Sequence, residues 1–205
     1  MTDQNPERAD DLRLLAACIS GDRGSWRVFV QRFSNLIYQT VRRTCASKHV
    51  SLINQDIEDL HNTVFLNLFE EKCKKLRQYR GKNGCSVASW IRLVTVRVVL
   101  NQVRKKGPDA LAWKQRSLPL EEIPELRVDS PNPLLMMEAQ ERERIVKEAF
   151  RKLPSRDKIF VRLHFEEQLP IEEVAEALGV STRTAYTVKH RAIKKLKTIV
   201  AANKG

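Results

Sequence analysis

The stretch that most constrains the fold is residues 169–197, where two amphipathic segments follow each other across a glycine. The first segment repeats apolar side chains at the three-to-four spacing of one helix face: Ile171, Val174, Ala175 and Leu178. Gly179 can adopt the positive φ of a tight turn, and Ser181 can cap a second helix. From Ser181 onward the chain has seven Lys or Arg and no Asp or Glu. The pattern predicts a helix-turn-helix at about residues 170–191, whose second helix suits a DNA groove.

Helical periodicity also dominates the rest of the chain, and no run of alternating apolar and polar residues is long enough to build a sheet. Helices are expected at about 10–19, 25–44, 54–74 and 87–104. Residues 107–133 contain five prolines without a sustained apolar period, which is typical of a linker. We therefore predict an all-α protein with two small helical domains, residues 1–106 and 134–205, joined by a flexible linker.

Charge is divided along the chain as sharply as periodicity. The net charge is +12, which favours polyanionic partners such as nucleic acid or an anionic membrane surface. Residues 54–71 hold five acids and no Lys or Arg, whereas residues 73–106 hold ten bases and no acids. Tyr79 and Trp90 lie within the basic segment, where they can stack on bases or, for Trp90 by preference, anchor the core. A solvated face is the alternative, but the exclusion of acids over the whole segment favours nucleic acid.

Several classes of function receive no support from the sequence. The four cysteines show no CxxC spacing and no His at metal-ligand distance, which indicates reduced thiols in the cytoplasm and no metal or cofactor. The polar amino terminus and the lack of a long apolar run predict neither export nor membrane insertion. No Gly-rich phosphate loop or nucleophile–base pattern points to catalysis.

Two groups of residues together resemble one family. Residues 58–65 on an acidic helix, followed by a basic loop and by Trp90-Ile91 opening a basic helix that ends at Arg104, look like conserved region two of bacterial RNA polymerase sigma factors. Leu153-Pro154, residues 173–175, Gly179-Val180-Ser181, Thr184 and His190-Arg191-Ala192 look like their region four. Since no further domain is evident, the chain is similar to the small extracytoplasmic-function (ECF) subfamily of the sigma-70 family.

The resemblance implies a transcription initiation factor without catalysis of its own, which directs core RNA polymerase to specific promoters and helps to melt them. It implies a monomer away from the polymerase and makes an anti-sigma partner plausible. On the acidic helix it implies contact with the clamp helices of the polymerase core, for which the candidate residues are Asp56, Asp59, Leu60, Asn62, Phe65 and Leu66. Without the resemblance, an ordinary amphipathic helix would be the preferred interpretation.

The resemblance assigns the two basic segments to promoter DNA. The loop at about residues 79–86 would hold a base flipped from the non-template strand, and the minus-ten candidates are Tyr79, Arg80, Lys82, Asn83, Arg97, Asn101 and Arg104. The minus-thirty-five candidates are Arg183, Thr184, Tyr186, Thr187, His190, Arg191 and Lys194. Loss of Arg191 should change sequence preference, whereas loss of Lys194 should weaken all binding alike. Lys189 occupies a position where the family prefers an apolar residue, so a slight rotation of this helix is expected.

Two other classes of protein remain open at this stage. A stand-alone helix-turn-helix regulator would bind a palindromic operator as a dimer, with residues 1–106 as a signal or dimerisation domain. An enzyme dependent on Cys73 and Cys85, through thiol chemistry or a metal, would show reactive thiols or bound zinc.

Overall fold

The computed structural model describes residues 6–48, 50, 52–81, 85–105 and 144–202. Within these residues the chain is helical and has no strand, which confirms the all-α prediction. The first group of helices comprises α1 (Pro6–Ser20), α2 (Arg23–Ser47), α3 (Asn54–Arg77) and α4 (Val87–Lys105). The second group comprises residues 144–151, α7 (Ser155–Val161), α8 (Ile171–Leu178) and α9 (Thr182–Ala202). The predicted linker at 107–133 lies outside the described residues.

The start of α2 follows from a capping aspartate that the sequence prediction did not use. The Asp22 carboxylate accepts hydrogen bonds from the backbone N–H of Ser25 at 2.8 Å and of Gly24 at 3.4 Å. Its bond from the Ser25 hydroxyl and these backbone bonds lower the pKa of Asp22, because they stabilise the charged form. The helix therefore begins at Arg23 and includes Gly24, two residues before the start at about residue 25 that the sequence predicted.

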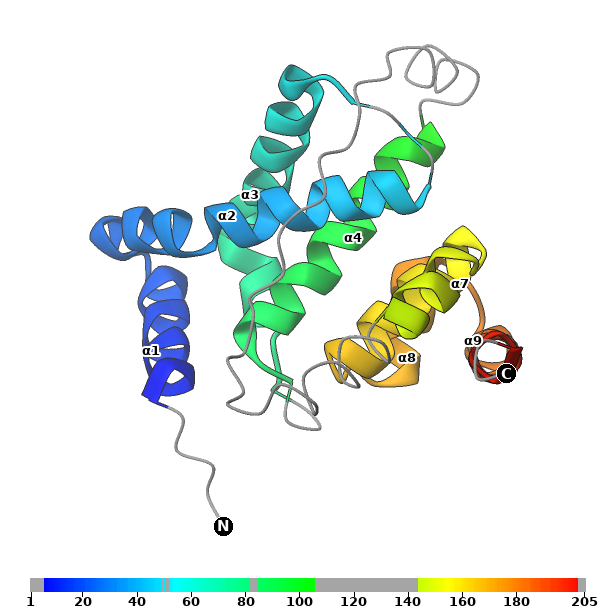
Figure 1. The fold of residues 1–205 in the computed structure, drawn as a ribbon. Coiled ribbons are helices and arrows are strands. Elements are labelled where there is room, and N and C mark those ends of the chain that lie inside the picture. Colours follow the sequence, from blue (N-terminus) through cyan, green and yellow to red (C-terminus); the bar gives the residue numbers. More distant parts are fainter. Residues whose placement is uncertain (1–5, 49, 51, 82–84, 106–143, 203–205) are drawn as a thin grey trace, which may run out of the picture.

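Helix α4 is the centre of the fold. It packs against α1, α2 and α3 and, on another side, against α8 of the second group. In Figure 1, α4 (green) runs between α2 and the yellow and orange helices of the second group. Most of its side chains are buried, including Ile91, Val99 and Trp90, so the expectation of Trp90 as a core anchor is confirmed. Burial around most of its circumference explains why the sequence of this helix shows only a weak amphipathic pattern.

Helix α3 is interrupted where the sequence predicted a continuous helix. Glu71, Lys72 and Cys73 have left-handed backbone angles, with φ of 49°, 56° and 60°. On the α2 side of the interruption, Trp26 stacks on Phe69 with ring centroids 5.0 Å apart, and its indole N–H donates to the Cys18 carbonyl. Beyond it, Arg77 donates to the Ile19 carbonyl at 3.0 Å. Tertiary contacts with the end of α1 thus accompany the strained turn.

The second group forms the predicted helix-turn-helix. Helix α7 continues into a π-helical turn at residues 162–166, and α8 follows after Pro170. Gly179 ends α8 with φ of 66°, the left-handed conformation expected from the sequence. Ser181 then caps α9, because its hydroxyl accepts a hydrogen bond from the Thr184 N–H at 3.2 Å. Among the described residues, no helix is both long and apolar enough to cross a bilayer.

All four cysteines are free and buried, and this leads to a first prediction. Burial raises the pKa of Cys45 from 9.0 to about 12, and that of Cys18 and Cys85 to about 11. We expect Ellman's reagent at pH 8 to modify almost no thiol in the native protein and all four in denaturant. Since the unfolded thiols ionise first, stability should be constant below pH 9 and should fall as the pH rises toward 12. Rapid native labelling of Cys73 or Cys85 would instead support the thiol enzyme.

Candidate nucleic-acid interface

Helix α9 presents a continuous polar face to solvent. Ala185, Val188 and Ala192 are buried against the rest of the second group. The opposite side exposes five of the predicted minus-thirty-five residues: Arg183, Tyr186, Thr187, His190 and Lys194. Thr184 is half-buried, and its hydroxyl lies 2.8 Å from that of Ser181, so it takes part in the cap of the helix. The exposed side chains can donate and accept hydrogen bonds and carry positive charge, as contacts with base edges and phosphates require.

Lys189 does not displace the buried face of this helix. Val188 is almost fully buried, and Lys189 lies at the boundary with its ammonium 5.7 Å from the centre of the Phe165 ring. This cation–π contact accounts for a lysine at a position where an apolar residue was expected.

Arg191 is tied to a buried acid on α7. Its Nε donates to Asp157 Oδ2 at 3.0 Å, and its Nη2 donates to Asp157 Oδ1. The Asp157 side chain is fully buried, whereas 52% of the Arg191 side chain remains exposed. Arg191 therefore reaches from the interior of the domain to the face that carries the other exposed residues of α9.

The loop before α4 is closed at its base by Tyr79. The Tyr79 hydroxyl donates to the Cys85 carbonyl at 2.7 Å, and its ring makes an edge contact with Trp90. Tyr79 is half-buried, so its ring is engaged within the protein in this arrangement and is not a free stacking surface. Arg80 is exposed beside it. Lys82 and Asn83 lie outside the described residues.

The basic side of α4 faces acids of the second group. Arg97 forms an ion pair with Glu176 of α8 at 2.8 Å, and Arg92 forms one with Glu167 at 2.7 Å. Glu167 also accepts a hydrogen bond from the Ser89 hydroxyl at 3.0 Å. Of the predicted minus-ten residues on α4, Arg97 is thus engaged in an ion pair with Glu176 of α8. Asn101 and Arg104 are exposed, and the Arg104 guanidinium donates a hydrogen bond to the Asn101 side chain.

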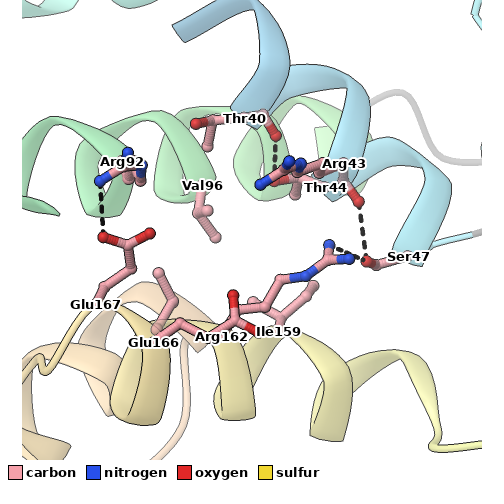
Figure 2. A pocket seen from close by; sticks show the side chains of 11 residues that line it. Thr40, Arg43, Thr44, Ser47, Arg92, Val96, Ile159, Arg162, Glu166 and Glu167 are labelled. Carbon is pink, nitrogen blue, oxygen red and sulfur yellow. Dashed lines mark hydrogen bonds and ion pairs between the residues drawn. The ribbon is translucent and has the colours of Figure 1, made fainter. Parts of the chain in front are cut away.

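A small cavity lies between the two groups beside the Arg92–Glu167 ion pair. Figure 2 shows Arg92 pointing to Glu167 on one side of it and Arg162 pointing to Ser47 of α2 on the other. The cavity has a volume of about 50 Å³, which is enough for a few water molecules. The described residues also hold no group of His, Cys, Asp and Glu that could bind a metal ion.

The acidic helix α3 has an exposed strip formed by Asp59, Asn62 and Leu66, and 61% of Leu66 is exposed. Three other predicted polymerase-contact residues are placed differently. Leu60 and Phe65 are buried in the core, so this structure does not present them to a partner, and their contact with the polymerase stays a prediction. Asp56 accepts a hydrogen bond from the Ile53 N–H at 3.3 Å and thereby caps the start of α3.

Sequence reasoning missed the acids that pair with the basic residues. Asp157 is preceded by Leu153-Pro154, which indicated a helix start, and an acid in the first helical turn is ordinarily explained by the helix dipole. Glu167 follows the π-helical turn and Glu176 lies in the second half of α8, where an acid is ordinarily explained as a solvated charge. Only the arginines with which they pair, which are far away in the sequence, distinguish these acids from ordinary solvated charges.

The two ion pairs between the first and the second group of helices should differ in strength. Glu167 is 19% exposed and bonds to two side chains, whereas Glu176 is 69% exposed. We expect Glu167→Gln to weaken the contact between the groups by about 1–3 kcal/mol and Glu176→Gln by less than about 1 kcal/mol. Small-angle scattering should show an increase in the radius of gyration that is larger for Glu167→Gln. Equal values for both variants and the unaltered protein would contradict this ranking.

Comparison with known proteins supports a DNA-binding role for the second group. The family model of sigma-70 region 4 matches residues 143–196, which include α7, α8 and most of α9. The solved structure of CnrH in complex with the cytosolic domain of CnrY aligns with 94% of this chain and 97% of that chain, at 18% identity and a TM-score of 0.46. A similarity at this TM-score and identity says nothing about the function of this chain. No curated protein matches the sequence. Residues 143–196 therefore carry a sigma-70 region 4 domain.

Proposed function

We propose that this protein is a sigma factor of the ECF type, which binds core RNA polymerase and directs it to specific promoters. The observation that carries the proposal is the sigma-70 region 4 domain, whose helix α9 exposes a face of basic and polar side chains without an acid. Sigma factors select promoters and are not enzymes. The factor acts in the cytoplasm, and core polymerase and promoter DNA are its partners. An anti-sigma protein is a further expected partner on family grounds.

Region 4 is proposed to read the minus-thirty-five element through α9. Arg183, Tyr186, Thr187 and His190 lie on the exposed face at spacings that bring them to one side of the helix. Arg191 extends the same face, and Lys194 follows one turn after His190, where it can meet a phosphate. Thr184 supports this face through the cap and is not proposed to contact a base.

The first group of helices is proposed to act as region two. The strip of Asp59, Asn62 and Leu66 on α3 offers a carboxylate, an amide and an apolar side chain to the clamp helices. The basic loop and α4 are proposed to bind the minus-ten element, with Arg80, Asn101 and Arg104 exposed and Arg97 available once it leaves Glu176. The family assigns Lys82 and Asn83 to the same loop. Tyr79 is proposed to hold the ends of that loop together, as its bond to Cys85 suggests.

Reconstitution tests the proposed function directly. We expect the purified chain to be monomeric, to bind sigma-free core polymerase, and to produce specific start sites from a genomic promoter library. The stand-alone regulator predicts a different outcome: a dimer that protects a palindromic site without polymerase. Absence of both core binding and specific transcripts would refute the proposal.

The strip on α3 gives a prediction with a matched control. Replacing Asp59 and Asn62 together by Lys should weaken core binding by a factor on the order of 100, because like charges at an interface cost several kcal/mol. Helix content and the unfolding temperature should stay unchanged, since both side chains are exposed. Asp10→Lys, a charge reversal on the exposed side of α1, should leave core binding intact. Binding is measured by competition with another sigma factor for labelled core.

Two residues of α9 should separate base reading from phosphate contact. Arg183→Gln should reduce discrimination at one minus-thirty-five position by about 1–3 kcal/mol and reorder the preferred sequences. Lys194→Gln should weaken binding to all promoters alike and reduce the slope of log affinity against log salt by roughly one. Holoenzyme binding to a library randomised at the minus-thirty-five element, repeated at several salt concentrations, measures both. An unchanged order of preferred sequences in Arg183→Gln would remove that residue from the readers.

A further inference from the structure

We infer that Asp157 is a positioning residue for minus-thirty-five recognition, which holds the Arg191 guanidinium in one orientation for a base edge. The inference rests on the proposed function, because it assigns Asp157 a part in promoter reading by region 4. Asp157 lies on α7 and cannot reach the exposed face of α9 itself, since its side chain is fully buried. Any effect of Asp157 on DNA therefore passes through Arg191.

The geometry of the pair suits this role. Both Asp157 oxygens are used, one by Nε and one by Nη2, so the planar guanidinium is held by two parallel bonds that fix its plane. Nη1 donates to neither oxygen. The outer edge of the fork is thus left free, on a side chain that is half exposed. Arginine reads guanine through two such donors, and the entropy of ordering the long side chain is lost on folding and not on DNA binding.

The surroundings of Asp157 strengthen the pair. Leu153 and Val161 beside it on the chain form an apolar cluster with Ala192 of α9, and Phe150 and Leu196 pack against that cluster. A carboxylate in such surroundings is weakly screened by water, so its attraction for Arg191 exceeds that of a surface ion pair. Helices α7 and α9 pack directly on each other, and the pair links them at the level of the exposed DNA face.

Position along α9 completes the argument. Arg191 is one turn beyond Thr187 and adjacent to His190, both exposed members of the proposed reading face. The side chains of Arg183, Tyr186, Thr187, His190 and Lys194 make no ion pair with an acid in the described part of the chain. Among the charged side chains of this face, Arg191 is the one that an ion pair holds within the described residues.

The test compares specificity with stability in reconstituted holoenzyme. The variants are Asp157→Asn, Arg191→Lys and the double variant, each assayed on a promoter library randomised at the minus-thirty-five element. Asp157→Asn should lower discrimination by roughly tenfold at the same position that Arg191→Lys affects. The double variant should lose no more discrimination than Arg191→Lys alone, because Asp157 acts only through the guanidinium. Glu172→Gln, an exposed acid-to-amide change on α8, is the control and should leave the sequence order unchanged.

A merely structural role gives a different result. Asp157→Asn would then lower the unfolding temperature and weaken binding to all sequences alike, with their order unchanged, and this would overturn the inference. Additive losses at different positions in the double variant would overturn it as well. If Asp157→Asn does not fold, Asp157→Glu keeps the charge but moves the carboxylate, and it should change the same position. Selection of no minus-thirty-five sequence by the unaltered holoenzyme would instead refute the proposed function itself.

Discussion

The structure depends on the burial of α4 between two sets of helices. Its apolar side chains fill the core of the first group and extend the same hydrophobic cluster to α8. The helix also carries Arg92, Arg97 and Arg104, so burial on this second side brings positive charge to an interface. Such charges must be paired or left at the edge, because an unpaired buried charge costs several kcal/mol. Glu167 and Glu176 meet the first two, and Arg104 lies at the exposed end of the helix.

At the end of α2, basic side chains from both groups lie near one another and repel each other. The pKa of Lys48, at the end of α2, is lowered by burial and by the guanidinium groups of Arg156 and Arg104. The chain has 25 acids against 37 bases, and two of these acids, Glu167 and Glu176, pair with arginines where the two groups meet. The face of α9, which has no acid, is turned to solvent. The positions of these acids thus determine that the basic side of α4 is paired in the free protein, whereas the basic face of α9 remains exposed.

Local signals in the sequence were sufficient for the helix-turn-helix and for most helix bounds. Gly179 ends α8 and Ser181 caps α9 because these residue types act through their own backbone and their nearest neighbours. The left-handed turn at 71–73 could not be predicted, since contacts of Trp26 and Arg77 with the end of α1 surround it. The same limit applies to the candidate site: the resemblance assigned Leu60, Phe65 and Leu66 alike to the polymerase contact, but tertiary packing buries Leu60 and Phe65 and leaves Leu66 exposed. The ion pair of Asp157 with Arg191 joins residues far apart in the sequence, and the bond of Tyr79 to the Cys85 carbonyl closes a loop, so neither contact could be recognised before the fold was known.

Gly179 also lies where the two groups meet. A Cβ built on it would come within 3.0 Å of the Arg104 guanidinium, in addition to the strain of a side chain at φ of 66°. A missense change at this glycine would therefore distort the turn that orients α9. It would also displace the Arg104 side chain of α4. A single promoter-defective allele at this codon would therefore disturb both of the proposed DNA-binding surfaces, although the whole linker and α7 lie between Arg104 and Gly179 in the sequence.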